Sequence, residues 1–178
     1  PRVQVLNDDP PGSGQDGDNQ YVKITRLEEP HRAGGVLWAA LGPHDIADST
    51  DGVMEVSARI YVPTGNESPV DIDALDNQPA KWTGRAFHVR IQPDGQVTYY
   101  RKEHISAGDL RVTLDEWHDV SIRADLAAGT FDLTVDGETV GALPFAEDDV
   151  NRVQSIAFAP NANNTTLYVD DVAVRVIP

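Results

Sequence analysis

The segment WHDVSIRADLAAGTFDLTVDGETVGALPF, residues 117–145, decides the fold class because its apolar residues recur at every second position. Val120, Ile122 and Ala124 alternate with polar or charged residues, and the same alternation resumes at Phe131. A period of two is typical of a strand that buries one face and exposes the other. The segment therefore predicts antiparallel strands that are joined by tight turns.

Similar alternating segments, separated by turn signals, extend along the rest of the 178-residue chain. Asp136-Gly137 and Pro93-Asp94-Gly95 are typical of hairpin turns, and residues 53–62 alternate in the same way. The second turn predicts a register that pairs Ile91 with Val97, Arg90 with Thr98 and His88 with Tyr100. Many short strands at about 8–12-residue spacing are typical of an antiparallel sandwich or barrel. We therefore expect one all-β domain over residues 1–178, with the polar segments 7–20 and 63–81 as long loops.

Residues 117–145, together with TTLYVDDVAV at 165–174, resemble the concanavalin A-like and laminin-G-like jelly rolls. The shared pattern is a Trp, an alternating strand, a turn with Asp and Gly, a strand ending in Asp-Gly, and a closing strand with Tyr-Val-Asp-Asp-Val. The resemblance implies a two-sheet antiparallel jelly roll from a superfamily of lectins, carbohydrate-binding modules, polysaccharide lyases and structural modules. The same closing strand occurs in galactose-binding-like carbohydrate modules, which are the alternative fold.

The chain is strongly acidic, with a formal charge of −15 and 21 Asp against 8 Glu. This balance argues against general nucleic-acid binding, because little positive charge is available to neutralise phosphates. No apolar run approaches the roughly 20 residues of a membrane span, so membrane insertion is not expected. Dense carboxylates favour an extracellular or cell-surface location, and a start at Pro1 suggests a processed piece of a larger secreted protein.

One hairpin differs from this acidic background. In FHVRIQPDGQVTYYRK, residues 87–102, the polar positions carry cations, an imidazole and a phenol. If residues 53–62 lie beside this hairpin, as their proximity in sequence favours, their outward side chains form one basic and aromatic surface. Trp82 is then expected at its rim. The candidate ligand-binding residues are Arg59, Tyr61, Trp82, His88, Arg90, Tyr100 and Lys102.

This surface suits an acidic sugar chain. The planar fork of an Arg matches a uronate carboxylate or a sulfate ester, and Tyr rings stack on pyranose faces. The leading interpretation is an extracellular module that binds a polysaccharide, expected to be anionic. Arg90→Ala is then expected to weaken binding while folding stays intact.

Three alternatives remain open. Polysaccharide lyases on this kind of sandwich use His or Tyr as base, Tyr as acid and Arg to neutralise the carboxylate. The resemblance therefore implies His88, Tyr100 and Arg90 as catalytic residues, although the longer motifs of alginate lyases are missing. The chain could also be a structural or adhesive subunit of a cell-surface assembly that pairs through edge strands. In the last alternative the basic residues are ordinary cross-strand pairs without a ligand.

A structural calcium ion is expected at the closing strand. Val172 and Val174 share parity with Asp170, which predicts an inward carboxylate that needs a counter-ion. Similar carbohydrate modules bind calcium between the N-terminal loop and this strand, and calcium takes about six to eight oxygen ligands. The expected ligands are Asp8, Asp9, Asp16, Asp18, Asp170 and Asp171.

Overall fold

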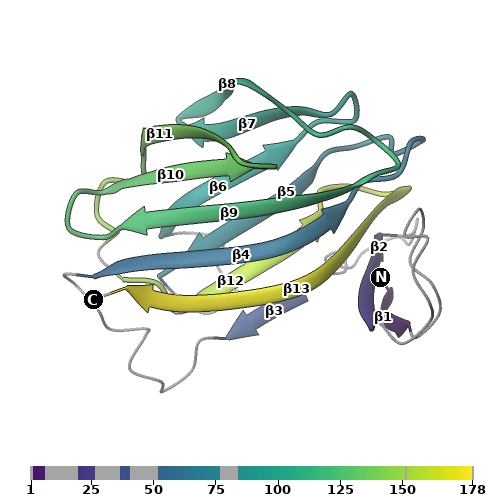
Figure 1. Cartoon of the computed structure of the whole chain (residues 1–178), viewed down its shortest axis with the longest axis horizontal. Helices are drawn as coiled ribbons and strands as arrows, with labels where there is room; N and C mark the ends of the chain where they lie inside the picture. Colours follow the sequence, from purple (N-terminus) through teal and green to yellow (C-terminus); the bar gives the residue numbers. More distant parts are fainter. Residues whose placement is uncertain are drawn as a thin grey trace.

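The alternating segments form two antiparallel sheets that pack face to face in the computed structural model (Figure 1). The structure describes residues 2–6, 20–26, 37–40, 52–76, 84–150 and 152–177. Within these ranges no helix is long and apolar enough to span a membrane. The predicted all-β sandwich is confirmed.

Seven strands of the described chain form one sheet, in the order β1-β2-β13-β4-β9-β10-β11. They are β1 (Arg2–Leu6), β2 (Tyr21–Arg26), β4 (Val53–Tyr61), β9 (Trp117–Asp125), β10 (Thr130–Val135), β11 (Glu138–Pro144) and β13 (Thr165–Ile177). The second sheet has six strands in the order β3-β12-β5-β6-β7-β8. They are β3 (Leu37–Ala40), β5 (Val70–Leu75), β6 (Arg85–Ile91), β7 (Gln96–Arg101), β8 (Glu103–Arg111) and β12 (Ser155–Pro160).

The segment that predicted the fold forms three consecutive strands, β9, β10 and β11. Ile122 of β9 pairs with Leu133 of β10, so the apolar residues of both strands share one face. Asp136 and Gly137 have φ values of 50° and 85°, the left-handed conformation that a tight hairpin turn of this type requires. The local sequence therefore determines both the strands and the turn.

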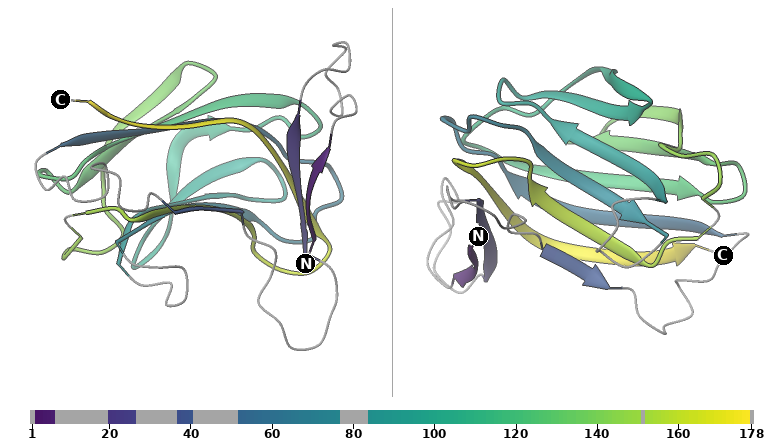
Figure 2. Two further views of the ribbon diagram at one scale, coloured as in Figure 1. Left: turned by 90° about the horizontal axis from the view of Figure 1, so that it is seen from below. Right: turned by 180° about the vertical axis from the view of Figure 1, so that it is seen from behind.

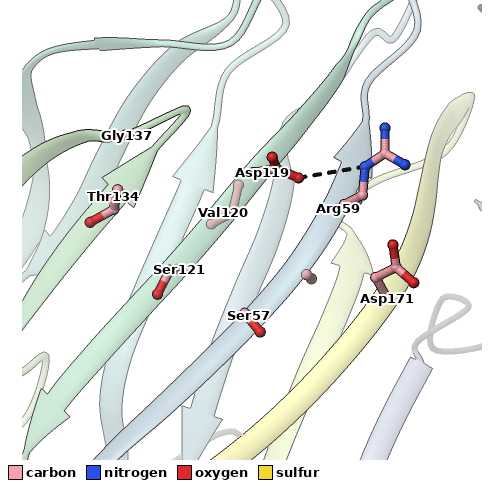
Figure 3. A pocket seen from close by; sticks show the side chains of 9 residues that line it. Ser57, Arg59, Asp119, Val120, Ser121, Thr134, Gly137 and Asp171 are labelled. Atoms are coloured by element: carbon pink, nitrogen blue, oxygen red, sulfur yellow. Dashed lines mark ion pairs between the residues drawn. The ribbon is translucent and has the colours of Figure 1, made fainter.

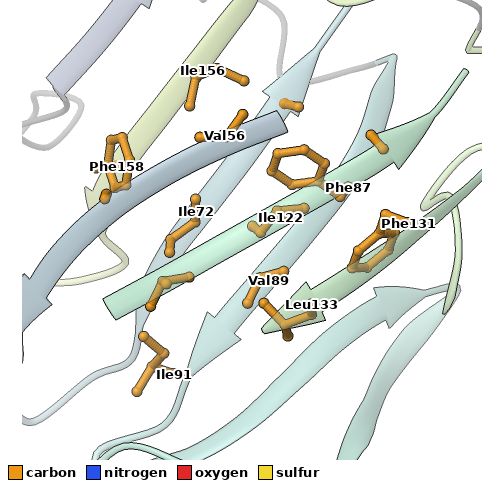
Figure 4. Packing of buried hydrophobic residues seen from close by; sticks show 14 of the residues in the cluster. Val56, Ile72, Phe87, Val89, Ile91, Ile122, Phe131, Leu133, Ile156 and Phe158 are labelled. Atoms are coloured by element: carbon orange, nitrogen blue, oxygen red, sulfur yellow. The ribbon is translucent and has the colours of Figure 1, made fainter. Parts of the chain in front are cut away.

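The core lies between the two sheets, where their apolar faces meet (Figure 4). Phe131 and Leu133 from the seven-stranded sheet face Phe87 and Val89 from the six-stranded sheet. The ring centroids of Phe87 and Phe131 are 5.8 Å apart with tilted planes, a favourable aromatic arrangement. Each sheet thus has one apolar face in the core and one face directed outward (Figure 2).

The expected loop at residues 63–81 is wrong over its central part, because β5 lies within it. All six residues of β5 are buried. Val70, Ile72 and Ala74 face the core, whereas Asp71 and Asp73 occupy the alternate positions. The three apolar residues were a strand signal, but the two aspartates and nearby prolines are typical of a turn-rich loop.

The prediction that residues 53–62 and 87–102 form one surface is also wrong. Strand β4 pairs with β9 and β13, whereas β6 pairs with β5 and β7. The two segments belong to opposite sheets because the chain crosses to the other layer before β5. Their outward faces therefore lie on opposite sides of the molecule.

The inward orientation expected for Asp170 is wrong because β13 contains a bulge. Its register with β4 shifts between Asp170 and Ala173, and Asp171 has a φ of 49°. Val169 faces the core on one side of the bulge, and Val172 beyond it is 39% exposed. The additional residue reverses the alternation, so Asp170 lies on the opposite face of the strand from Val169.

We expect Phe131→Ala to lower the free energy of unfolding by about 3–5 kcal/mol, because it removes a fully buried ring and leaves a cavity. Urea unfolding measures the change. Ile105→Ala on strand β8 is the control, since Ile105 is 37% exposed, and it should cost about 0.5 kcal/mol or less. Equal stability of the two variants would contradict the assigned core.

Candidate functional site

The outward face of the six-stranded sheet carries two buried carboxylates, Asp71 and Asp73 of β5. They are 4% and 0% exposed, respectively. The antiparallel register places Arg90 of β6 opposite Asp71 and His88 opposite Asp73. Because buried charge is costly unless it is paired, this register decides what the basic residues of β6 do.

Asp71 is held by two neighbouring side chains. Arg90 donates from Nε to Oδ1 at 2.7 Å and from Nη2 to Oδ2 at 3.0 Å, a bidentate ion pair. Asn161 donates from Nδ2 to Oδ2 at 2.7 Å. Both oxygens of Asp71 are therefore satisfied, and the guanidinium plane of Arg90 is fixed.

Asp73 is the more deeply buried of the two carboxylates. Its Oδ1 lies 2.5 Å from Nδ1 of His88 and 3.3 Å from Nε of Arg85. Its Oδ2 is buried and accepts no hydrogen bond from the described residues. His88 also connects the two carboxylates, because its Nε2 lies 3.7 Å from Oδ1 of Asp71.

The ring of His88, which belongs to this network, packs near the rings of Tyr100 and His104. The centroids of His88 and Tyr100 are 5.9 Å apart, and His104 lies 5.3 Å from each of them. The hairpin register predicted from the turn is confirmed, since Arg90 pairs with Thr98 and Ile91 pairs with Val97. The site thus combines a fixed guanidinium with a cluster of three rings.

His104 belongs to this cluster although the sequence analysis gave it no role. Desolvation by its neighbours, then the guanidinium of Arg90 and the imidazole of His88, lower the pKa of His104 to about 4, although the residue is exposed at the surface. It pairs with Tyr100 across a tight turn at Lys102, which has a φ of 65°. A lysine in this conformation lacks the Gly or Asn that usually signals such a turn, so the pairing was not evident.

The other predicted ligand-binding residues do not join this site. Lys102 lies exposed at the turn between β7 and β8, and Arg59 lies on the opposite sheet. Tyr61 is also on that sheet and is buried, with Trp117 and Tyr168 at centroid distances of 5.7 and 5.4 Å. Trp82 lies outside the described residues.

The expected calcium site stays a prediction. Asp170 and Asp171 are described, but the other four expected ligands lie outside the described residues: Asp8, Asp9, Asp16 and Asp18. The described residues by themselves contain no group of three or more His, Cys, Asp or Glu that could hold a metal ion.

Comparison with family models and with curated protein sequences finds no match. Solved structures do match. A sialidase superimposes with a TM-score of 0.64 and 13% identity over 90% of this chain, and the binding domain of botulinum neurotoxin serotype G with 0.59 and 14% over 98%. The alginate lyase A1-II′, of polysaccharide lyase family 7, superimposes with 0.62 and 12% over 89% of this chain and 80% of its own.

The fold is that of the concanavalin A-like jelly rolls. The chain spans only 16% of the sialidase and 41% of the neurotoxin domain. An alginate lyase from Alteromonas sp. 272 matches over 94% of its length at 12% identity and a TM-score of 0.56. At identities this low the superpositions show a shared fold alone, and the function has to be argued from the site itself.

We expect Arg90→Ala to lower the free energy of unfolding by about 3 kcal/mol, because the carboxylate of Asp71 would stay buried without its bidentate partner. This result would correct the sequence-based expectation that folding stays intact. Arg111→Ala is the matched control, since Arg111 and Asp94 form an exposed pair at 3.6 Å, and it should cost about 1 kcal/mol or less.

Urea unfolding of both variants measures these costs. A double change, Arg90→Met with Asp71→Leu, should recover most of the loss because neither charge of this pair then stays buried. If Arg90→Ala is as stable as Arg111→Ala, the buried carboxylate of Asp71 does not need the ion pair with Arg90 for the protein to stay stable.

We expect the lowered pKa of His104 to make stability fall as the pH falls from 6.5 to about 4. In the unfolded chain the imidazole of His104 is protonated below its ordinary pKa of 6.5, whereas in the folded chain it is protonated only below about pH 4. Between these two pH values the unfolded state therefore binds more protons than the folded state, and lowering the pH stabilises the unfolded state relative to the folded state. His104→Gln should flatten the pH dependence of urea unfolding in this window, and an unchanged slope would contradict the assignment.

Proposed function

We propose that this chain is an extracellular carbohydrate-binding module that holds an anionic polysaccharide on the outward face of the six-stranded sheet. The ligand would lie over Arg90, Tyr100 and His104. The observation that carries the proposal is the bidentate contact by which Asp71 fixes the guanidinium of Arg90 beside two aromatic rings.

Arg90 still has donors to offer a ligand. Asp71 uses its Nε and Nη2, and Nη1 donates to no described residue. The side chain of Arg90 is 17% exposed, so the free edge would meet a sugar carboxylate at the surface. A guanidinium that is already ordered loses little conformational freedom on binding.

The local charge supports an acidic ligand. The formal charge of the chain is −15, but on this face Arg85 and Arg90 offset the carboxylates of Asp71 and Asp73. An acidic sugar chain would therefore meet a locally neutral surface, where repulsion by the rest of the protein is weakest. Tyr100 and His104 supply ring faces for the apolar side of a pyranose.

The structural neighbours are consistent with a polysaccharide partner. Several are alginate lyases, and one family 7 alginate lyase was solved in complex with its substrate. That ligand belongs to those proteins, and the likeness suggests which ligand class to test first. Uronate polymers are therefore the first probes for this chain.

A second candidate function is a polysaccharide lyase, and the pair formed by His88 and Asp73 favours it. Asp73 engages Nδ1, so the nitrogen that would act as a base is Nε2 of His88, which lies 3.7 Å from Oδ1 of Asp71. In the proposed step His88 takes the proton from C5 of a uronate, and that electron pair forms the C4=C5 double bond. The C4–O bond breaks, Tyr100 protonates the departing oxygen, and Arg90 neutralises the sugar carboxylate.

We expect wild type to bind uronate oligosaccharides, and we expect Tyr100→Ala to weaken binding about tenfold because a stacking ring is lost. Isothermal titration calorimetry measures the affinity. Arg175→Ala is the control, since Arg175 lies on the opposite sheet with Glu55 as its partner, and it should bind as wild type.

Ultraviolet absorbance of the unsaturated product separates binding from cleavage. A lyase generates the C4=C5 double bond during incubation, and His88→Asn should then abolish the signal. A binding module gives no signal with any polymer. If wild type neither binds nor cleaves any uronate polymer, the proposed function is wrong, and a structural or adhesive subunit becomes the leading interpretation.

A further inference from the structure

The outward face of the seven-stranded sheet contains a depression of about 280 Å³, on the side of the molecule opposite the proposed polysaccharide surface (Figure 3). It spans strands β4, β9 and β10 and reaches the bulge of β13. None of the residues used in the proposed function lines it. Its lining includes Ser57, Arg59, Asp119, Ser121, Thr134 and Asp171.

The depression exists because small side chains occupy adjacent positions on neighbouring strands. Ser57 of β4 pairs with Ser121 of β9, and Ser121 pairs with Thr134 of β10. Longer side chains stand on the next outward row, where Arg59 pairs with Asp119. The difference in length between the two rows leaves a hollow over the serines.

Arg59 forms one wall of the hollow, and two neighbouring side chains hold it in place. Nε of Arg59 lies 3.5 Å from Oδ1 of Asp119, and its guanidinium carbon lies 5.5 Å from the ring centroid of Trp117. Trp117 in turn packs against Tyr61. The guanidinium is thus positioned by an ion pair and a cation–π contact before any ligand arrives.

The hollow presents both hydrogen-bond donors and acceptors. The carboxylate of Asp119 is 80% exposed, and Asp171 is exposed in the bulge of β13. The hydroxyls of Ser57 and Ser121 make no hydrogen bond to the described residues. Arg59 supplies donors, the two aspartates supply acceptors, and the serines supply both.

This mixture selects the charge of the ligand. An anion is disfavoured, because the carboxylates of Asp119 and Asp171 outnumber the single guanidinium of Arg59. A neutral molecule with many hydroxyl groups can use every one of these partners without repulsion. The volume is near the lower end for small-molecule sites, which suits a single sugar ring.

We propose that this depression binds one ring of a neutral saccharide, at a site independent of the six-stranded sheet. Asp171 accepts hydrogen bonds from sugar hydroxyls, Arg59 donates to sugar oxygens, and the serine hydroxyls line the floor. With a ligand surface on each sheet, one molecule contacts two glycan chains at once, and that arrangement raises avidity on a mixed polysaccharide surface.

Cellotetraose and mannotetraose, which are both uncharged, are the probes, and calorimetry on the full chain measures their affinity. Wild type is expected to bind at least one of them. Ser121→Tyr fills the hollow and should weaken binding at least about tenfold. Asp171→Asn should weaken it about tenfold, because a charge-assisted acceptor is lost while Asn tolerates the left-handed φ of 49°.

Thr113→Tyr is the control for the added ring, since Thr113 is exposed in the loop before β9 and away from the hollow. It should bind the tetrasaccharides as wild type, and so should Tyr100→Ala, which tests the other sheet. Circular dichroism checks the fold of each variant. If Ser121→Tyr does not fold, the affinity of Asp171→Asn for the tetrasaccharides tests the site instead.

The proposal is overturned if wild type binds neither tetrasaccharide, or if Asp171→Asn binds as tightly as wild type. Loss of tetrasaccharide binding in Tyr100→Ala also overturns it, because the ligand would then lie on the six-stranded sheet. Failure of uronate binding leaves this site unaffected, so the two proposals fail separately.

Discussion

Each central strand of this sandwich can turn only one of its two faces toward the core between the sheets, and most of the molecule follows from that constraint. Phe87 of β6 and Phe131 of β10 meet in the core because alternate residues of both sheets point inward. The remaining residues of the same strands must point outward, and the two sheets direct them to opposite sides. Arg59 and Arg90 lie on the outward faces of different sheets, so the two side chains cannot form one surface.

The basic residues of β6 first serve the protein's own carboxylates. Asp71 and Asp73 are buried on the outward face of β5, and Arg90, Arg85 and His88 are their partners. This explains why so acidic a chain places cations along one strand. The same contacts fix Arg90 near His104, so under the proposed function a structural ion pair would also prepare a surface for an acidic ligand.

The two outward faces differ in the physical basis of recognition. The six-stranded sheet offers an ordered guanidinium and ring faces over a charge-balanced network, the features on which the proposal of an acidic sugar chain rests. The seven-stranded sheet offers a hollow that short side chains create next to a wall formed by Arg59, with donors and acceptors of both signs. The two sheets share one architecture, and the outward side chains of each sheet are what distinguish the two proposed ligands.

The sequence by itself determined the elements that depend on neighbouring residues. The alternation at residues 117–145 predicted β9, β10 and β11, and the Pro93-Asp94-Gly95 turn predicted the register that brings His88 to Tyr100. These features could be predicted because a turn and a period of two act over a few residues. They fix which face of a strand is buried and which strand follows across a hairpin.

Only the tertiary structure decided which strands share a sheet. A period of two is the same in either sheet, so it could not show that β4 and β6 lie on opposite sides. Asp71 and Asp73 resembled loop residues until the pairing of β5 with β6 supplied their partners. The bulge at Asp171 reversed the parity of the closing strand, and a tight turn at Lys102 brought His104 to the site. Each of these outcomes depends on pairing between strands or on a turn without its usual residues, and neither is encoded in the spacing of apolar residues along one strand.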